Sequence, residues 1–134
     1  MKSVAILGHG FIGSRLLKYL NTFDGITAKC ASNTAHSDEV DHLDYTNFNI
    51  LADYLRGVDY VVNASGFTGV PNVDGCENEK EACWRLNVVS PGVSYAASVL
   101  HNARYIHISS GCIYDEYKAS GDGWSENDTP NFGL

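Results

Sequence analysis

The sequence of 134 residues has no apolar run long enough to cross a membrane, and its N-terminus lacks the charged start and apolar core of a signal peptide. Its four cysteines form no C-x-x-C pair and its five histidines form no H-x-x-x-H pair, so neither a zinc site nor a disulfide framework is expected. Internal repeats and low-complexity tracts are also absent. These absences predict one cytoplasmic domain over residues 1–134, with no metal and no membrane partner.

Basic residues are scarce, since nine Lys and Arg face sixteen Asp and Glu and give a net charge of -7. Four basic residues and one acid precede Asp38, whereas five bases and fifteen acids follow from Asp38 onward. An acidic surface argues against nucleic-acid binding, which usually needs a basic face. The positive bias of the first part suits an anionic ligand.

A predicted buried strand, Lys2–Leu7, leads directly into Gly-His-Gly-Phe-Ile-Gly at residues 8–13 and then into an amphipathic helix, Phe11–Thr22. In a dinucleotide-binding fingerprint of this form the first glycine permits a sharp turn. The second lets the backbone approach a pyrophosphate, and the third lets helix and strand pack closely. The N–H groups at the helix start then face the phosphates, so a cofactor site is favoured over a purely structural glycine turn. Predicted cofactor contacts are Gly8, His9, Gly10, Phe11, Ile12 and Gly13.

The rest of the chain alternates between short strands and helices. Further strands are predicted at Ile26–Ala31, His42–Tyr45, Asp59–Ala64 and Arg104–Ser109. Helices are predicted at Asn47–Leu55, with Thr46 as N-cap and Gly57 at its end, and at Glu77–Leu100, bent by Pro91. The alternation predicts an α/β fold with a doubly wound parallel sheet, Rossmann-like, whose ligand lies at the carboxyl ends of the strands.

Two further expectations concern the second half of the chain. The helical stripe of Leu86, Val89 and Val93 is expected in the core rather than in a cofactor site. Residues 115–134 are acidic and turn-rich, and they are expected to form a solvated loop region.

Polar residues follow two predicted strands, where a ligand is expected: Asn63-Ala-Ser-Gly66 and Ser109-Ser-Gly-Cys112, with Asn87 in the helix between them. Together with the glycine turn, these segments resemble the extended short-chain dehydrogenase/reductases. Residues 66–77, Gly-Phe-Thr-Gly-Val-Pro-Asn-Val-Asp-Gly-Cys-Glu, are similar nearly residue for residue to UDP-4-keto-6-deoxyglucose 3,5-epimerase/4-reductases of rhamnose synthesis, as are residues 110–114 and 126–132. dTDP-4-dehydrorhamnose reductases and GDP-fucose synthases are similar more loosely.

The resemblance implies that Asn63, Ala64 and Gly66 pass beside the adenosine and ribose and that Asn87 supports the site from inside. Ser65, in the same segment, is also a predicted cofactor contact.

It also implies that Ser110 is the catalytic residue that hydrogen-bonds the 4-keto oxygen of a nucleotide-sugar substrate. Cys112 matches the cysteine that acts as an acid at the sugar carbon in epimerising members, a role that a poised thiol can fill. The alternatives are a strand-capping hydroxyl for Ser110 and a small buried side chain for Cys112. Cys76 is expected to serve packing rather than catalysis.

The family's catalytic Tyr-x-x-x-Lys pair, which needs helical i,i+4 spacing, has one formal match here, Tyr114 to Lys118. This segment has no helical pattern and runs into Gly121, so we do not expect a catalytic pair there. The family places its pair just beyond the position of Phe132, and the sequence is therefore expected to be the first half of a longer enzyme. By itself it should bind a nucleotide but turn over slowly or not at all. The alternative is a non-catalytic, NAD(P)-binding regulatory module, and the resemblance also allows a homodimer.

The end of the second predicted strand, Cys30-Ala-Ser-Asn33, carries no acid, whereas an NAD site usually has one there to hold the ribose 2′-hydroxyl. Small polar residues, Asn33 among them, leave room for a 2′-phosphate that Lys29 or Arg15 would neutralise. The predicted cofactor is therefore NADP, with NAD as second choice.

Overall fold

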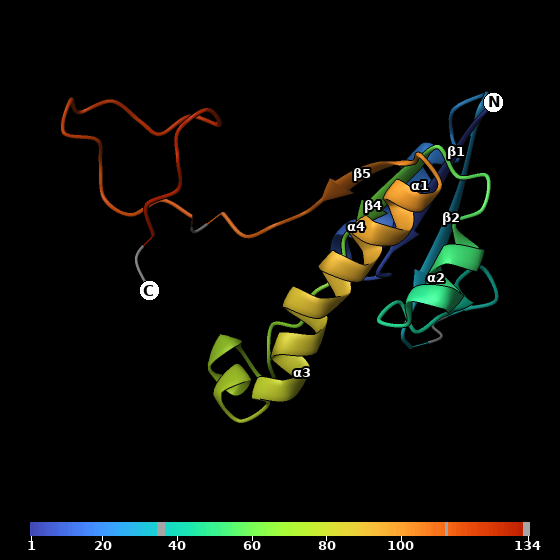
Figure 1. Cartoon of the computed structure of the whole chain (residues 1–134), viewed down its shortest axis with the longest axis horizontal. Coiled ribbons are helices and arrows are strands. Elements are labelled where there is room, and N and C mark those ends of the chain that lie inside the picture. The colour runs from blue at the N-terminus through green and yellow to red at the C-terminus, as the bar shows by residue number, and fades with distance from the viewer. Residues whose placement is uncertain (35–36, 112, 133–134) are drawn as a thin grey trace.

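The computed structural model describes residues 1–34, 37–111 and 113–132. It contains one five-stranded parallel sheet, in the order β3-β2-β1-β4-β5 (Figure 1). Its strands are β1 (Lys2–Leu7), β2 (Ile26–Ser32), β3 (Asp41–His42), β4 (Tyr60–Asn63) and β5 (Arg104–His107). The predicted α/β class and parallel, doubly wound sheet are confirmed.

The strand order reverses at β1, which pairs with β2 on one side and β4 on the other. The chain builds outward from β1 to β3 and then crosses back to place β4 and β5 beyond the opposite edge of β1. Ligands of open α/β sheets bind at the carboxyl ends of the strands where such a reversal occurs. Leu7 and Asn63, which are register partners at the ends of β1 and β4, therefore mark the expected binding edge.

Helices cover the two faces of the sheet unequally (Figure 1). Helix α1 (Phe11–Leu20) lies on one face, where its Leu17 packs with Ile6. Helices α2 (Phe48–Tyr54) and α4 (Ser90–Leu100) cover the other face and pack with Leu7 and Val61. Successive strand residues point to opposite faces, so a continuous apolar run such as that of β1 fits a strand buried on both sides.

The α1 face keeps an apolar groove of about 500 Å³ between α1 and the β5 edge. Ile106 and Ile108 stand along it with exposed fractions of 42% and 41%. The lining residues are Lys2, Val4, Leu16, Leu20, Ile26, Tyr60, Val62, Ile106 and Ile108.

Two local predictions were wrong around the third strand. The strand occupies Asp41–His42 rather than His42–Tyr45, and it is short because it pairs only with the end of β2. The N-cap of α2 is Asn47, whose side chain accepts hydrogen bonds from the backbone N–H groups of Asn49 and Ile50. Thr46 instead bonds the Asp44 carboxylate through its N–H and its hydroxyl, so its side chain completes the preceding turn.

The predicted long helix Glu77–Leu100 begins instead at Lys80 and consists of three consecutive parts, preceded by a separate 3₁₀ turn. A 3₁₀ turn, η1 (Val73–Glu77), precedes α3 (Lys80–Trp84), a π-helical turn η2 (Arg85–Val89) and α4. Pro91 lies in the first turn of α4, directly after the π turn. Because proline lacks an N–H donor and its ring crowds the preceding turn, a widened turn at this position fits the predicted local distortion.

The buried face of α4 is also different from the predicted apolar stripe. Leu86 is half-buried and Val89 is 39% exposed, and only Val93 of the three packs against the core. The fully buried positions instead carry small side chains, which let the helix axis lie close to the sheet and to α2. They are Ser90, Ser94, Ala97 and Ser98.

Residues 113–132 extend away from the sheet and contain neither helix nor strand (Figure 1). The Tyr114 hydroxyl donates to the backbone oxygens of Ser125 and Asp128, each at 2.9 Å, and its ring stacks on Trp124. Lys118 pairs with Asp128 at 2.6 Å. Among the described residues, no helix is long and apolar enough to span a bilayer.

Candidate functional site

The three glycines of the first turn have different surroundings. A Cβ on Gly8, whose φ is +99°, would lie 2.8 Å from the Ser65 backbone, and a Cβ on Gly13 would overlap the carbonyl oxygen of Gly8. Both positions therefore require glycine for close packing. A Cβ on Gly10 would meet no atom within 4 Å, so the space above Gly10 is open to a ligand.

The start of α1 faces this open space without a capping side chain, because its N-cap is Gly10. The N–H group of Ser14 donates a hydrogen bond of 3.1 Å to the carbonyl oxygen of Gly10, which closes the first turn of the helix. The N–H groups of the first helical turn, which have no partner within the helix, are suited to bind an anion such as a phosphate.

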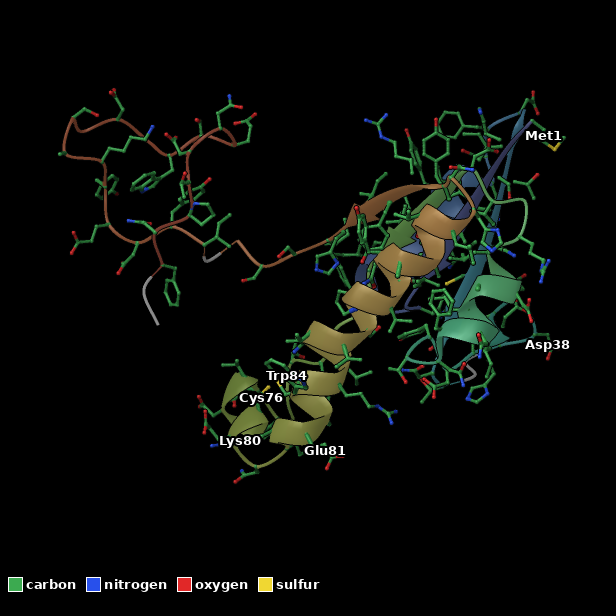
Figure 2. All side chains as sticks on the ribbon, in the orientation of Figure 1. Met1, Asp38, Cys76, Lys80, Glu81 and Trp84 are labelled. Atoms are coloured by element: carbon green, nitrogen blue, oxygen red, sulfur yellow. The ribbon has the colours of Figure 1, made fainter. Side chains whose placement is uncertain are left out.

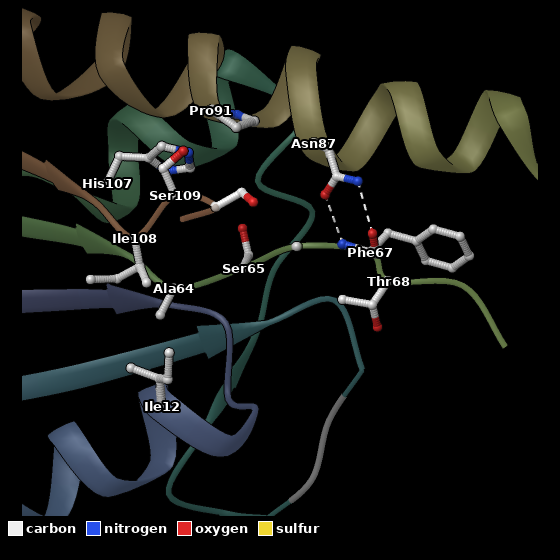
Figure 3. A pocket seen from close by; sticks show the side chains of 12 residues that line it. Ile12, Ala64, Ser65, Phe67, Thr68, Asn87, Pro91, His107, Ile108 and Ser109 are labelled. Atoms are coloured by element: carbon white, nitrogen blue, oxygen red, sulfur yellow. Dashed lines mark hydrogen bonds between the residues drawn. The ribbon is translucent and has the colours of Figure 1, made fainter. Parts of the chain in front are cut away.

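A cavity of about 600 Å³ opens at the carboxyl ends of β4 and β5, between α1 and the η2–α4 helix (Figure 3). Six predicted site residues lie in its wall: Ile12, Ala64, Ser65, Gly66, Asn87 and Ser110. Six others were not predicted as contacts: Phe67, Thr68, Pro91, His107, Ile108 and Ser109. Phe67 and Thr68 directly follow Gly66, and residues 107–109 directly precede Ser110. Their position next to predicted site residues is the sequence signal that could have identified them. Among the described residues, the wall contains no Asp, Glu, Lys or Arg.

Asn63 belongs to the frame of the cavity and not to its wall. Its side chain is fully buried, and its Oδ1 accepts from the N–H and the hydroxyl of Ser65 at 3.0 and 2.6 Å. Its Nδ2 donates to the Tyr105 hydroxyl at 3.0 Å. Asn63 therefore orients Ser65 toward the cavity, and burial raises the pKa of the Tyr105 hydroxyl that supports it.

Asn87 holds the segment that follows Ser65. Its Oδ1 accepts from Phe67 N–H and its Nδ2 donates to Phe67 O, both at 2.8 Å (Figure 3). A single amide thus satisfies both backbone groups of one loop residue, which fixes the path of the chain along the cavity wall.

Four predicted residues lie apart from this wall. His9 borders a separate hollow beside Leu17, and Phe11 is 74% exposed with the Arg15 guanidinium 3.6 Å from its ring centre. Asn33 directly follows β2, and its buried Oδ1 has no hydrogen-bond partner among the described residues. Lys29 is turned toward α2, with its ammonium over the Tyr54 ring, and burial lowers its pKa.

Ser110 is exposed at the cavity, whereas Cys112 lies outside the described residues. The formal Tyr114–Lys118 pair is not built on a helix. Each side chain has partners of its own, since Tyr114 bonds backbone oxygens and Lys118 pairs with Asp128. The hydrogen bond from Lys118 lowers the pKa of Asp128 to about 2. In the part of the chain that the structure describes, no three His, Cys, Asp or Glu side chains converge on a metal site.

Comparison with known proteins identifies relatives of this chain. The model of the NAD dependent epimerase/dehydratase family matches residues 4–132. A bifunctional dTDP-4-dehydrorhamnose 3,5-epimerase/dTDP-4-dehydrorhamnose reductase of Arabidopsis thaliana is 41% identical over 80 residues, covering 54% of this chain and 26% of that protein. A trifunctional UDP-glucose 4,6-dehydratase/UDP-4-keto-6-deoxy-D-glucose 3,5-epimerase/UDP-4-keto-L-rhamnose-reductase of the same plant is 42% identical over 79 residues, covering 54% and 12%. The predicted resemblance to enzymes of rhamnose synthesis is confirmed.

Solved structures agree with the fold. A hypothetical dTDP-4-dehydrorhamnose reductase from Sulfolobus tokodaii superposes with a TM-score of 0.76 at 27% identity, covering 98% of this chain and 46% of that one. MoeE5 in complex with UDP-glucose and NAD superposes with a TM-score of 0.76 at 23% identity, covering 96% and 42%. The chain thus spans less than half the length of these proteins. Its fold, its glycine turn and the match over residues 4–132 show that the chain belongs to the NAD-dependent epimerase/dehydratase family.

Proposed function

We propose that this chain is the cofactor-binding part of an NADP(H)-dependent reductase and 3,5-epimerase that acts on a 4-keto-6-deoxy sugar nucleotide. The observation that carries this proposal is the cavity whose uncharged wall includes Ile12, two residues after the open position at Gly10, and the exposed Ser110. An anionic cofactor meets helix N–H groups at one end of this space, and a carbonyl substrate meets a hydroxyl at the other.

Each part of the cavity has its own role in binding or reduction. The turn at Gly10 binds the pyrophosphate, and Ile12 and Ala64 provide apolar walls for the cofactor. Bound NADPH supplies the hydride that reduces the keto group. Ser110 donates a hydrogen bond to the keto oxygen and holds it in place, while Asn87 keeps the Phe67 segment closed around the ligand.

Epimerisation is assigned to Cys112, which would return a proton to the sugar carbon as an acid. Replacing Cys112 by Ser should abolish proton exchange with solvent at that carbon while leaving nucleotide affinity unchanged. Deuterium incorporation from D₂O into the sugar, followed by NMR, measures this step separately from reduction.

The preference for NADP rests on the absence of an acid at residues 30–33. Lys29 is half-buried against Tyr54, whereas Arg15 is exposed beside the glycine turn, where it contacts Phe11, and is therefore the cation placed to meet a 2′-phosphate. The buried Oδ1 of Asn33, which has no hydrogen-bond partner among the described residues, favours the second choice, NAD, because an amide oxygen accepts from a ribose hydroxyl. Titration calorimetry with NADPH and NADH decides: tighter NADPH binding that Arg15→Ala removes supports the first, and tighter NADH binding overturns it.

A regulatory NAD(P)-binding module is the second candidate. It is favoured by the engagement of Tyr114 and Lys118 with partners far from a catalytic arrangement. The test is reduction of UDP-4-keto-6-deoxyglucose by the chain with NADPH. If the isolated chain binds NADPH without turnover, both candidate functions remain. If turnover appears when a second polypeptide supplies a Tyr-x-x-x-Lys helix, the result supports the enzyme.

We also propose a homodimer as the assembly of this part of the enzyme. An exposed apolar stripe runs along α3, η2 and α4, at positions that share one helical face: Trp84, Val88, Tyr95 and Val99. Light scattering should give twice the mass of the chain, and Val88→Glu should return it to the monomer. A monomeric wild-type chain at 100 μM would contradict the assembly.

A further inference from the structure

Two cysteines outside the cavity wall face each other across a tight turn. Cys76 lies in η1 and Cys83 in α3, and the two thiols are close enough to interact. Figure 2 labels Cys76 beside the segment that carries Lys80, Glu81 and Trp84. Both cysteines are free and half-buried, so each thiol remains within reach of small molecules.

The backbone holds this pair together. Glu79 N–H donates to Cys76 O at 3.2 Å, and Cys83 N–H donates to Glu79 O at 2.9 Å. These two successive bonds fold the start of α3 back onto η1. The backbone of the turn therefore brings the two cysteines close together.

The pair is also connected to the cavity. Asn87 Nδ2, which donates to Phe67 O, lies 3.3 Å from Cys83 Sγ. On the other side, the Cys76 backbone N packs against Gly69, where a Cβ would come within 2.9 Å of it. Cys83 thus contacts Asn87 directly, and Cys76 lies against Gly69, two residues after the Phe67 that Asn87 holds.

We propose that Cys76 and Cys83 form a reversible intramolecular disulfide, and that this bond fixes the Gly66–Thr68 segment of the cavity wall against the helix. The small polar thiol pair thereby acts as a redox site beside the nucleotide cavity. Disulfide formation does not depend on the proposed function.

The chemistry balances with a small-molecule disulfide such as oxidised glutathione as the oxidant. One cysteine thiolate attacks the disulfide, which releases one glutathione thiolate and leaves a mixed disulfide. The second cysteine then displaces the other glutathione. Two protein thiols lose two electrons and two protons in total, and one glutathione disulfide becomes two thiols.

The surroundings predict that this oxidation is faster in alkaline solution. Burial raises the pKa of the Cys76 thiol, and the contact with Cys83 and the carboxylates of Glu79 and Glu77 raise it further. The thiolate is the attacking species, so the rate should increase from pH 7 to pH 9. Cys30 is an internal control, because burial raises the pKa of its thiol to about 11.

Trypsin provides a direct test, because Lys80 separates the two cysteines. The folded chain is incubated with oxidised glutathione at pH 8.5, its remaining thiols are alkylated, and it is then unfolded and digested. The expected product is residues 57–80 joined to residues 81–85, lighter than the two reduced peptides by two hydrogen atoms. Dithiothreitol should separate them. Cys112→Ser should give the same linked pair, and Cys83→Ser, which keeps an acceptor for Asn87, should lose it.

Hydrogen exchange tests the second half of the proposal. The Phe67 amide should exchange at least threefold more slowly in the oxidised chain than in the reduced chain, and the difference should be absent in Cys83→Ser. Glutathione retained on either cysteine, or a disulfide between two chains, would overturn the site. A linked pair with unchanged Phe67 exchange would overturn the coupling. A nucleotide titration of the reduced chain reports separately on the proposed function.

Discussion

Asn87 and Phe67 are twenty residues apart in the sequence, yet two hydrogen bonds of 2.8 Å join one side-chain amide to both backbone groups of the other residue. The amide completes the loop as a neighbouring strand would. Strand β4 ends at Asn63, so no strand pairing holds the chain at Phe67. The path of the cavity wall there depends instead on Asn87.

Replacing Asn87 by Ala removes both bonds, and we expect nucleotide affinity to fall by about five- to thirtyfold, since each of two exposed hydrogen bonds contributes roughly 0.5–1 kcal/mol. Asn87→Asp keeps the acceptor for Phe67 N–H but sets a carboxylate against Phe67 O, so it should not restore binding. Calorimetry measures both. Asn49→Ala, on the exposed side of α2, is the matched control, and an equal loss there would contradict the assignment.

The glycine turn allows stability and binding to be separated. Gly13→Ala places a methyl group on the Gly8 carbonyl oxygen and should lower the free energy of unfolding by about 2–3 kcal/mol. Gly10→Ala meets no atom within 4 Å, so its urea midpoint should be near that of the wild type, while its methyl group obstructs the pyrophosphate. Unchanged nucleotide affinity in Gly10→Ala would exclude this turn as the phosphate site.

The cap of α2 provides a test of the local correction. Asn47→Ala removes the acceptor for two helical N–H groups and should cost about 1 kcal/mol. Thr46→Ala keeps its N–H bond to Asp44 and should cost less. Urea unfolding followed by circular dichroism compares them, and a larger loss for Thr46→Ala would restore Thr46 as the cap.

The loop after β5 should respond to acid at an unusually low pH. The Lys118 contact depresses the pKa of Asp128 from 3.8 to about 2. A depressed carboxyl pKa stabilises the folded loop above the ordinary pKa, and this contribution is lost as the pH falls through about 2. The indole signal of Trp124, stacked on Tyr114, should therefore change near pH 2 in the wild type. In Asp128→Asn it should already be altered at pH 7, and identical spectra at pH 7 would contradict this role.

The sequence predicted what depends on local pattern. The bounds of β1 and the start of α1 were predicted correctly, because an apolar run and a glycine turn are short-range signals. The polar segments at Ser65 and Ser110 could be placed at one edge, since the carboxyl ends of parallel strands lie together.

The features that were missed depend on tertiary contacts. The serine-lined face of α4 is buried because small side chains permit close packing, and no hydrophobic pattern marks it. Thr46 and Asn47 are both good capping residues, and Asp44 decides between them by bonding Thr46 first. The role of Asn63 in orienting Ser65 likewise depends on Tyr105, which lies forty-two residues farther along the chain.

The groove beside α1 has a consequence for handling the protein in solution. Ile106 and Ile108 line it next to β5, which in the described sheet has a neighbour only on the β4 side. An edge strand with free backbone groups and adjacent apolar side chains is a template for intermolecular strand pairing. At high concentration, pairing between β5 edges of different chains should therefore limit solubility. Precipitation should begin with this pairing and not with global unfolding.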